Sequence, residues 1–466
     1  MDNPKKYKVE GAADDVDLMP VLTSADERRQ RIHTHVMAGV AKMFPVEGKA
    51  YDLSVENLTV KPITASFEDQ KTAILSGATL REAVHGDVVL KDKAGKVIER
   101  KRKLLGHVPF LTERHTFIVK GNEYSVSNQL RIKPGIYTRE RDNGQLESAF
   151  NLSRGKNFRL SLEPTRGVFL IEYGTSRLPL LPLLSALGVT DAQLAEAWGK
   201  DLLDVNRKVV GTHSRKVVTK LYQTLIPVTE RSPDLTELEM GKQLSDMYAR
   251  TGLDPEVTTM TLGTPHTTVD SKALLAASAK LLRVFKKEDT PDDRDSLAFK
   301  TLHTAETFFE ERLSKDARKQ LKMKLTRKLR QGIEDPTIDA VLPPSLISAP
   351  LQSFLTTSTL ANTPMQINPI ELLDSTTVVT TLGEGGISDT LAVPEESRNV
   401  HSTHLGILDP VRTPESGTAG ISVRATVHMA RDQRGDRYTP MRNTKSGEVV
   451  YVPVKALVNK TVAFAG

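Results

Sequence analysis

The chain has 466 residues, a length that predicts two to four domains. Lysine and arginine exceed aspartate and glutamate by six, which is compatible with a nucleic-acid partner but does not require one. The chain has no cysteine, and this excludes a disulfide framework and cysteine-ligated zinc. No apolar run approaches the roughly 20 residues that span a bilayer, and residues 1–10 lack an apolar signal core, so we expect a soluble protein that works in a cytoplasm, without a membrane.

The N-terminal part of the chain predicts one helix followed by hairpins. We expect the helix from about Ala25 to Met43, where His33 and His35 point to different faces and so do not share a metal ion. A turn at residues 93–96 separates two strand-like runs and predicts a hairpin. A second hairpin is predicted around the turn at residues 120–122.

The middle of the chain predicts antiparallel strands followed by helices. Residues 158–162 and 168–173 read as strands joined by a turn. Thr190 and Gln193 form a capping box that starts a short helix, which ends near Gly199. Further helices are predicted at about 214–225 and 271–287. The second of these begins at Asp270 and carries one apolar stripe that is expected to face a core, formed by Leu274, Leu281, Leu282 and Phe285.

Two charged segments follow. The acidic cluster at residues 292–295 lacks the spacing of an EF-hand, so helix capping and ion pairing are favoured over a metal site. From Arg312 to Arg330, nine residues are basic and one is acidic, while leucine or alanine recurs every four residues. This pattern predicts an amphipathic basic helix that follows a phosphate backbone, packs on an acidic partner or stays in solvent.

The stretch from Phe354 to Ile421 has the composition of a loop, because it is rich in threonine, serine, glycine and proline. It has few lysines and glutamates, and a long ordered loop in a compact chain is usually functional. Its glycines at residues 383–386 do not form a P-loop, since no Lys-Ser/Thr pair follows at the required spacing. His401 and His404 have no third ligand, which favours hydrogen bonding within the loop over a metal site.

Strand-like runs at residues 423–428 and 449–458, with a polar turn at residues 443–447, complete the predicted elements. No self-contained catalytic constellation appears along the chain. The residue patterns alone therefore assign no catalytic residue and no metal ligand.

Several segments resemble the β subunit of multisubunit RNA polymerases. The run NPIELLDSTTVVTTLGEGGI, which starts at Asn368, resembles the segment around the rifampicin pocket of that family, and residues 398–406 and 413–421 resemble the motifs that follow it. The run TFIVKGNEYSVSNQLRIKPGIY, which starts at Thr116, resembles an earlier block. The acidic segment at residues 291–313 resembles a further block in part, since an alanine and a phenylalanine replace its glycine and asparagine. The resemblance covers the chain from about residue 50 to its end.

This resemblance implies a mixed α and β fold with several domains. Residues 1–140 and 286–355 would form a protrusion-like domain, residues 141–285 a lobe-like insertion, and residues 356–466 a fork region with hybrid-facing and fork loops. In cellular β subunits several hundred more residues would follow. The resemblance therefore implies the N-terminal half of a split β subunit, of the type encoded by giant bacteriophages.

The implied function is DNA-directed RNA synthesis, a nucleotidyltransferase reaction, by a subunit that does not work alone. Mg²⁺ would be held by another subunit. The implied partners are the C-terminal half of the split β subunit, β′-like subunits, template DNA, the RNA transcript and a phage specificity factor. The place would be the bacterial host cytoplasm or the virion. The rival hypothesis is a phage structural or nucleic-acid-binding protein that keeps this fold without polymerase activity.

The resemblance also assigns residues. Those at positions that contact or shape nucleic acid are Asn362, Arg398, Thr413, Pro414, Glu415 and Thr418, with Arg131 and Lys133 as basic candidates near the second hairpin. The alternative is loop architecture for the first six and a solvated charged face for the two basic residues. In the rifampicin segment, Ser375 replaces a histidine of the family and Thr377 and Val378 replace arginines, so the implied enzyme is rifampicin resistant. Thr380 stands for a serine there, and Met365 for an acidic residue upstream.

Overall fold

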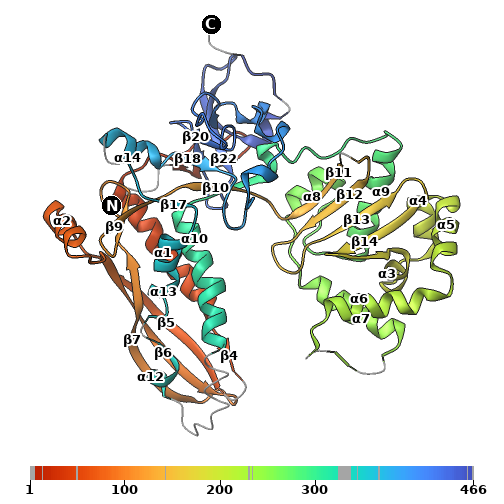
Figure 1. Ribbon diagram of the computed structural model, residues 1–466, viewed down its shortest axis with the longest axis horizontal. Coiled ribbons are helices and arrows are strands. Elements are labelled where there is room, and N and C mark those ends of the chain that lie inside the picture. Colours follow the sequence, from red (N-terminus) through yellow and green to blue (C-terminus); the bar gives the residue numbers. More distant parts are fainter. Residues whose placement is uncertain are drawn as a thin grey trace. The chain divides into compact units, whose positions relative to one another are not determined.

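The computed structural model describes residues 6–12, 14–48, 51–141, 143–228, 231–232, 235–323, 337–343, 345–365, 368–458 and 460–463. Its fold is mixed α and β and rests on several sheets, which confirms the predicted fold class (Figure 1). The chain forms two compact units: an inserted unit, Ile132–Phe299, and a flanking unit, Met1–Arg131 with Lys300–Gly466. The domain limits and names implied by the resemblance stay a prediction. No helix in the described ranges is both long and apolar enough to cross a membrane.

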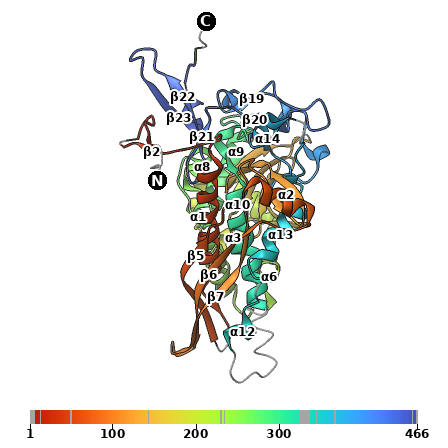
Figure 2. The same ribbon diagram turned by 90° about the vertical axis from the view of Figure 1, so that its left-hand side faces the viewer.

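In the flanking unit a long helix lies against a four-stranded antiparallel sheet (Figures 1 and 2). Helix α1 spans Ala25–Met43, as predicted, and begins at Ser24, whose hydroxyl accepts a hydrogen bond from the Glu27 amide at 3.2 Å. Its buried face packs on the sheet and on helix α10, Ala305–Glu311. The strands are β4, Val46–Glu47, β5, Tyr51–Lys61, β6, Arg81–Asp92, and β7, Val97–Pro109, so the predicted hairpin at residues 93–96 is confirmed.

Helix α10 continues into the predicted basic helix. A π-helical segment, η4, Arg312–Ala317, follows it, and helical residues extend to 323. Leu313, Ala317 and Leu321 are buried, which confirms the apolar stripe over this part. The rest of the predicted helix, residues 324–330, lies outside the described residues.

A three-stranded sheet contains the second predicted hairpin, whose strands β8 and β9 are joined by the expected turn. Its strands are β8, Phe117–Val119, β9, Asn122–Val126, and β17, Ala361–Asn362. The remaining elements of this part of the unit are β1, Lys6–Tyr7, β2, Val16–Asp17, α2, Phe67–Leu75, α12, Ile338–Val341, and α13, Ser348–Thr357.

A mixed five-stranded sheet joins segments that are far apart in the sequence, in the order β16-β10-β18-β20-β19. Strand β10 runs parallel to β18, with Asn128 opposite Val379. The side-chain amide of Asn128 fixes this register, because it donates to the carbonyl oxygens of Thr376, at 2.8 Å, and Val378, at 2.9 Å. The strands are β10, Asn128–Ile132, β16, Lys300–His303, β18, Val378–Thr380, β19, Leu408–Asp409, and β20, Ser422–Ala425.

The stretch that the sequence marks as a long ordered loop contains several short elements. Besides β18 and β19, they are helix α14, Pro369–Ser375, and the 3-10 turns η5, Thr390–Ala392, η6, Glu396–Arg398, and η7, Ser402–His404. Three strands follow and form one sheet with the N-terminal strand β3, Met19–Pro20. They are β21, Ala430–Arg431, β22, Arg437–Arg442, and β23, Val449–Pro453. The strand predicted to reach residue 458 is wrong beyond Pro453, because helix α15, Val454–Leu457, buries its first and last residues at a helical spacing.

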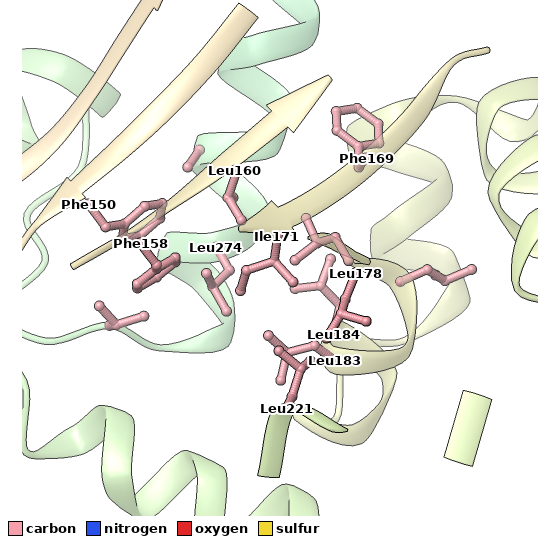
Figure 3. Packing of buried hydrophobic residues seen from close by; sticks show 14 of the residues in the cluster. Phe150, Phe158, Leu160, Phe169, Ile171, Leu178, Leu183, Leu184, Leu221 and Leu274 are labelled. Atoms are coloured by element: carbon pink, nitrogen blue, oxygen red, sulfur yellow. The ribbon is translucent and has the colours of Figure 1, made fainter. Parts of the chain in front are cut away.

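The inserted unit is a five-stranded antiparallel sheet whose main core lies between one face of the sheet and several helices. Phe150, Phe158, Leu160 and Ile171 point from the strands into a core that they share with helix residues such as Leu274 (Figure 3). The strands are β11, Gly135–Glu140, β12, Leu146–Asn151, β13, Phe158–Glu163, β14, Val168–Tyr173, and β15, Ser176–Pro179. The helices are α3, Leu181–Ala186, α4, Asp191–Trp198, α5, Lys200–Val210, η1, Gly211–His213, α6, Ser214–Leu225, α7, Glu237–Ala249, α8, Pro255–Leu262, α9, Ser271–Phe285, and η3, Leu297–Phe299.

The local signals in this unit are mostly confirmed. Thr190 and Gln193 form the predicted capping box of α4, and Gly199 ends that helix. The predicted core position of Phe285 is wrong: its side chain is 47% exposed, because α9 ends there. In the acidic cluster, Asp292 pairs with the buried ammonium group of Lys280 at 2.6 Å, which is the ion pairing that the sequence favoured.

Candidate functional site

A cavity of about 400 Å³ lies in the flanking unit, beside the five-stranded sheet. Strands β9, β17, β18 and β20, helix α14 and their loops supply its lining, so it depends on segments that are far apart in the sequence. Its polar lining is mainly hydroxyl groups, and we call it the hydroxyl cavity; the serines and threonines are Ser125, Ser127, Thr359, Thr363, Ser375, Thr380, Thr418 and Ser422. Hydroxyl groups donate and accept hydrogen bonds, and they can hold sugar and phosphate groups without reading base sequence.

Three of the eight residues assigned from the sequence meet at this cavity: Asn362, Pro414 and Thr418. Asn362 ends β17, which pairs with β9, and its carbonyl oxygen accepts a hydrogen bond from the Ser125 hydroxyl at 3.3 Å. The hydroxyl oxygen of Thr418 lies 3.1 Å from that of Ser416, which holds the threonine within its loop. The cavity therefore combines an amide side chain from one segment with a hydroxyl group from another.

Thr413 closes the loop that carries Pro414 and Thr418. Its hydroxyl donates to the carbonyl oxygen of Ser422 at 2.9 Å and accepts from the amide of Gly420 at 2.8 Å. Gly420 has a φ of +70°, and a Cβ at this position would collide with the backbone of Arg398 at the end of η6. These hydrogen bonds stabilise the loop, which is the alternative to a nucleic-acid contact that the sequence left open for Thr413.

Arg398 connects this loop to the segment around Thr390 by hydrogen bonds. Its guanidinium group donates to the carbonyl oxygens of Gly417, at 2.9 Å, and Thr390, at 2.8 Å. Glu415 is exposed, and its side chain makes no hydrogen bond or ion pair within the part of the chain that the structure describes. Glu415 is therefore open to a ligand, whereas two donors of Arg398 serve the fold.

Arg131 does not line the cavity but supports the glycine turn at residues 382–387. Its guanidinium group donates to Gln129 Oε1 at 2.6 Å, to Glu311 Oε2 at 2.7 Å and to the carbonyl oxygen of Glu384 at 2.8 Å. A Cβ on Gly385 would come within 2.5 Å of the guanidinium carbon, so the turn needs glycine where the arginine passes. This arrangement uses all three guanidinium nitrogens within the protein.

Lys133 stands apart from the other assigned residues. It is only 6% exposed and belongs to the inserted unit, where its backbone amide donates to the carbonyl oxygen of Phe299 at 2.8 Å. A phosphate contact needs an exposed ammonium group. The sequence suggested that Lys133 lies either on a nucleic-acid-binding surface or on a solvated charged surface. In this structure its side chain is buried.

Sequence reasoning missed a charged cluster at the wall of the hydroxyl cavity. Arg424 lines the cavity and donates from Nε to Asp374 Oδ2 at 2.9 Å, and Arg412 donates to the other carboxylate oxygen at 2.7 Å. Burial alone would raise the pKa of Asp374, but hydrogen bonds from the two arginines outweigh burial and hold the pKa below its usual value. Arg424 and Asp374 are 50 residues apart and share no periodic pattern, so no signal in a single sequence pairs them.

The histidines of this region make hydrogen bonds within their loop, as the sequence favoured. His401 Nδ1 accepts from the Thr403 amide at 3.1 Å, and His404 Nδ1 accepts from the His401 amide at 3.3 Å. Among the described residues, no three histidine, aspartate or glutamate side chains are grouped as metal ligands.

The segment that contains most of the cavity lining has known relatives. Residues 363–430 match the family model for RNA polymerase Rpb2, domain 3. The chain is 25% identical over 384 residues to the DNA-directed RNA polymerase subunit beta of Gloeobacter violaceus (strain ATCC 29082 / PCC 7421), a match that covers 78% of this chain and 34% of the relative. It is also 25% identical over 406 residues to the corresponding subunit of Zygnema circumcarinatum, covering 84% of this chain and 36% of that protein. The chain spans about a third of the length of these curated relatives.

Proposed function

We propose that this chain is a non-autonomous subunit of a multisubunit DNA-directed RNA polymerase and that the lining of its hydroxyl cavity contacts the RNA–DNA hybrid. The observation that carries the proposal is the meeting of Asn362, Pro414 and Thr418 at one cavity. The resemblance assigned Asn362 and Thr418 to positions that line the hybrid and Pro414 to the fork loop, and Asn362 comes from a different segment of the chain than the other two. Two of the three lie in the segment that matches Rpb2 domain 3.

The cavity is suited to positioning rather than to bond breaking. Phosphoryl transfer by two metal ions needs clustered carboxylates, and Glu371 is the one carboxylate in the described lining. Hydroxyl and amide groups can fix the sugar and phosphate groups of a hybrid, and a displacement of the reacting end by about 1 Å can cost roughly 100-fold in rate. Mg²⁺, and the charge stabilisation that it supplies, would belong to another subunit.

In its finer form, the proposal is that the chain is the N-terminal half of a split β subunit of a giant-bacteriophage polymerase. This assignment rests on the sequence resemblance. The partners would be the C-terminal half of that subunit, β′-like subunits, template DNA, the RNA transcript and a specificity factor. The enzyme would act in the host cytoplasm or be carried in the virion.

The test is to purify the chain alone and together with the subunits that accompany it, and to assay template-dependent RNA synthesis. We expect synthesis by the complex and none by the single chain. RNA synthesis by the single chain would show that the non-autonomous assignment is wrong. Recovery of the chain in phage particles, without β′-like subunits and without polymerase activity, would favour the structural rival.

A second measurement addresses the cavity itself. In the assembled enzyme, Asn362→Ala and Thr418→Val each remove a hydrogen-bonding side chain from the lining, and each should slow elongation by about tenfold or more. The matched control is Thr72→Ala, an exposed threonine on α2 outside the cavity. Normal elongation rates in both cavity variants would contradict the proposal that the lining of this cavity contacts the hybrid.

A further inference from the structure

The sheet of the inserted unit has a second face, opposite the apolar core. Residues alternate between the two faces of a strand, and the registers place Tyr137, Ala149, Arg159 and Glu172 in one row across β11, β12, β13 and β14. Arg139 and Glu147 form the neighbouring row on the same face. One face of this sheet is therefore apolar and the other carries arginine and glutamate side chains.

A cavity of about 470 Å³ lies on this polar face, and we call it the arginine cavity. The small side chain of Ala149 lies between Tyr137 and Arg159 in the register, which leaves room above the middle of the sheet. The charged residues of the lining are Arg139, Lys156, Arg159, Arg294, Glu147 and Glu172. Four cations and two carboxylates thus line the cavity, an excess of two positive charges.

The two carboxylates are already used. Glu147 is 1% exposed and accepts hydrogen bonds from Arg139, at 2.5 Å, Arg159, at 3.4 Å, and Arg141. Burial alone would raise the pKa of Glu147, but the hydrogen bonds from the arginines outweigh it and lower the pKa, so the group is ionised. One carboxylate cannot neutralise three guanidinium groups. Glu172 in turn pairs with Arg177 at 3.3 Å.

Arg294 is a cation of the cavity lining that this network does not fully satisfy. Its Nε is buried with no hydrogen-bond partner among the described residues, as is the Nε of Arg141. Burial, and then the nearby charge of Arg139, lower the pKa of Arg294, yet an arginine remains charged in proteins. A buried guanidinium N–H without a hydrogen-bond partner costs free energy, and an oxyanion that enters the cavity and accepts from it would recover that cost.

We propose that the arginine cavity is a binding site for a phosphate group, with Arg294, Arg159 and Lys156 as its binding residues and Glu147 as the residue that positions the arginines. The planar fork of arginine matches two phosphate oxygens at once, and the excess of two positive charges matches a phosphate dianion. The phosphate group belongs to a small soluble ligand or to a nucleic-acid backbone. The site is independent of the function proposed for the flanking unit.

The experiment uses the full chain and inorganic phosphate as the first probe. Thermal unfolding of the inserted unit is followed by the fluorescence of Trp198, which is buried in that unit. Phosphate should raise the melting temperature more than chloride at equal ionic strength. In Arg294→Gln this phosphate-specific shift should disappear, with affinity for phosphate reduced about tenfold or more in a calorimetric titration. Without phosphate, the melting temperature of the variant should stay close to that of the wild type, because Arg294 Nε has no hydrogen bond to lose among the described residues.

The matched control is Arg166→Gln, which removes an exposed arginine of the same unit that lies outside the cavity. It should leave the phosphate response unchanged. Equal phosphate responses in Arg294→Gln and the wild type would overturn the proposal, as would the absence of any phosphate-specific response in the wild type.

A second probe separates the two sources of phosphate. A single-stranded phosphodiester oligonucleotide that displaces inorganic phosphate from the wild type, and that binds Arg294→Gln about tenfold more weakly, assigns the site to a nucleic-acid backbone. Failure of the oligonucleotide to compete assigns it to small phosphate ligands. A polymerase assay is not involved, so this test and the test of the proposed function can fail separately.

Discussion

Single residues at the hydroxyl cavity decide which ligands it can hold. Met365, Ser375, Val378 and Thr380 all line it, and Thr377 is buried beside them. By resemblance, these are positions at which the β subunit carries an acidic residue, a histidine, two arginines and a serine. Four of these five positions thus line one cavity, and none of the five carries a charged side chain in this chain.

We therefore expect the assembled enzyme to resist rifampicin. The loss of two charged hydrogen-bond donors, worth about 1.5–3 kcal/mol each, weakens binding by a factor on the order of 100 or more. The measurement is promoter-dependent transcription across a rifampicin titration. The double variant Ser375→His with Val378→Arg restores two donors and should shift inhibition toward lower drug concentrations. Inhibition of the unmodified enzyme at concentrations that stop a sensitive bacterial polymerase would contradict the residue assignments in this segment.

His303 makes the stability of the flanking unit depend on pH. Burial, and then the positive charge of Arg131, lower its pKa to about 4, whereas a histidine in an unfolded chain titrates near 6.5. Between these values the unfolded state binds more protons, so the contribution of His303 to stability is complete above pH 6.5 and is lost as the pH falls toward 4. The loss is up to about 3 kcal/mol.

His303→Gln should flatten this dependence. Calorimetric melting at pH 7.5 and pH 4.5 measures it, and His428→Gln, which changes an exposed histidine of the same unit, is the control. If His303→Gln lost as much stability between the two pH values as the wild type, the low pKa of His303 would not be a source of the acid sensitivity.

At the scale of elements, the glycine turn at residues 382–387 makes hydrogen bonds to both strand β10 and helical segment η4. Arg131 and Gln129 from β10 hold its backbone, and Glu384 at its tip accepts a hydrogen bond from Arg312 of η4 at 3.0 Å. A Cβ atom at Gly386 would lie 2.4 Å from the carbonyl oxygen of Thr381 and 2.7 Å from Gln129 Nε2, so the turn requires glycine here.

Gly386→Ala should destabilise the flanking unit by about 1–3 kcal/mol, because the new methyl group meets backbone that cannot move freely. Gly417→Ala is the matched control, since a Cβ there meets nothing within 4 Å and its φ is not in the left-handed region. Urea unfolding of the two variants gives the comparison. Equal stabilities would show that the turn relaxes and is not a fixed support.

The elements that could be predicted from the sequence are those fixed by neighbouring residues. Ser24 and Asp270 act within one helical turn, and the turn at residues 93–96 joins strands that are adjacent in the chain. The pairing of Asn128 with Val379 could not be predicted, because it depends on an amide that reaches backbone about 250 residues away.

Some residues of the candidate site could likewise be identified from the sequence, and others could not. Asn362, Pro414 and Thr418 were found by resemblance to a family, and local physics alone would not have selected them. The ion pairs of Asp374 with Arg424 and Arg412 form only when α14, β20 and their loops are folded together. Residue types and spacing therefore indicated a functional stretch, while its charged contacts needed the tertiary structure.

At the scale of the whole molecule, the inserted unit should fold by itself. Every residue of its main core cluster lies between Ile136 and Val284, so the core needs no side chain from the flanking unit. Residues 132–299 expressed alone should melt cooperatively and show the fluorescence of a buried tryptophan. Leu274→Ala should cost about 2–5 kcal/mol both in this fragment and in the full chain. A broad, non-cooperative transition of the fragment would contradict its independence.

The position of the inserted unit within the flanking unit has a consequence for the order in which the ribosome makes the protein. It departs after β10 and returns at β16, which are neighbouring strands of one sheet. Helix α1 leaves the ribosome with Val36 and Val40 facing a core that is completed only by Phe308 and Phe309 of α10. At about 5–20 residues per second, synthesis of the intervening unit takes roughly 8–34 s. The nascent chain must keep that apolar face covered for at least this interval, because the helix that completes the core is made only after the inserted unit.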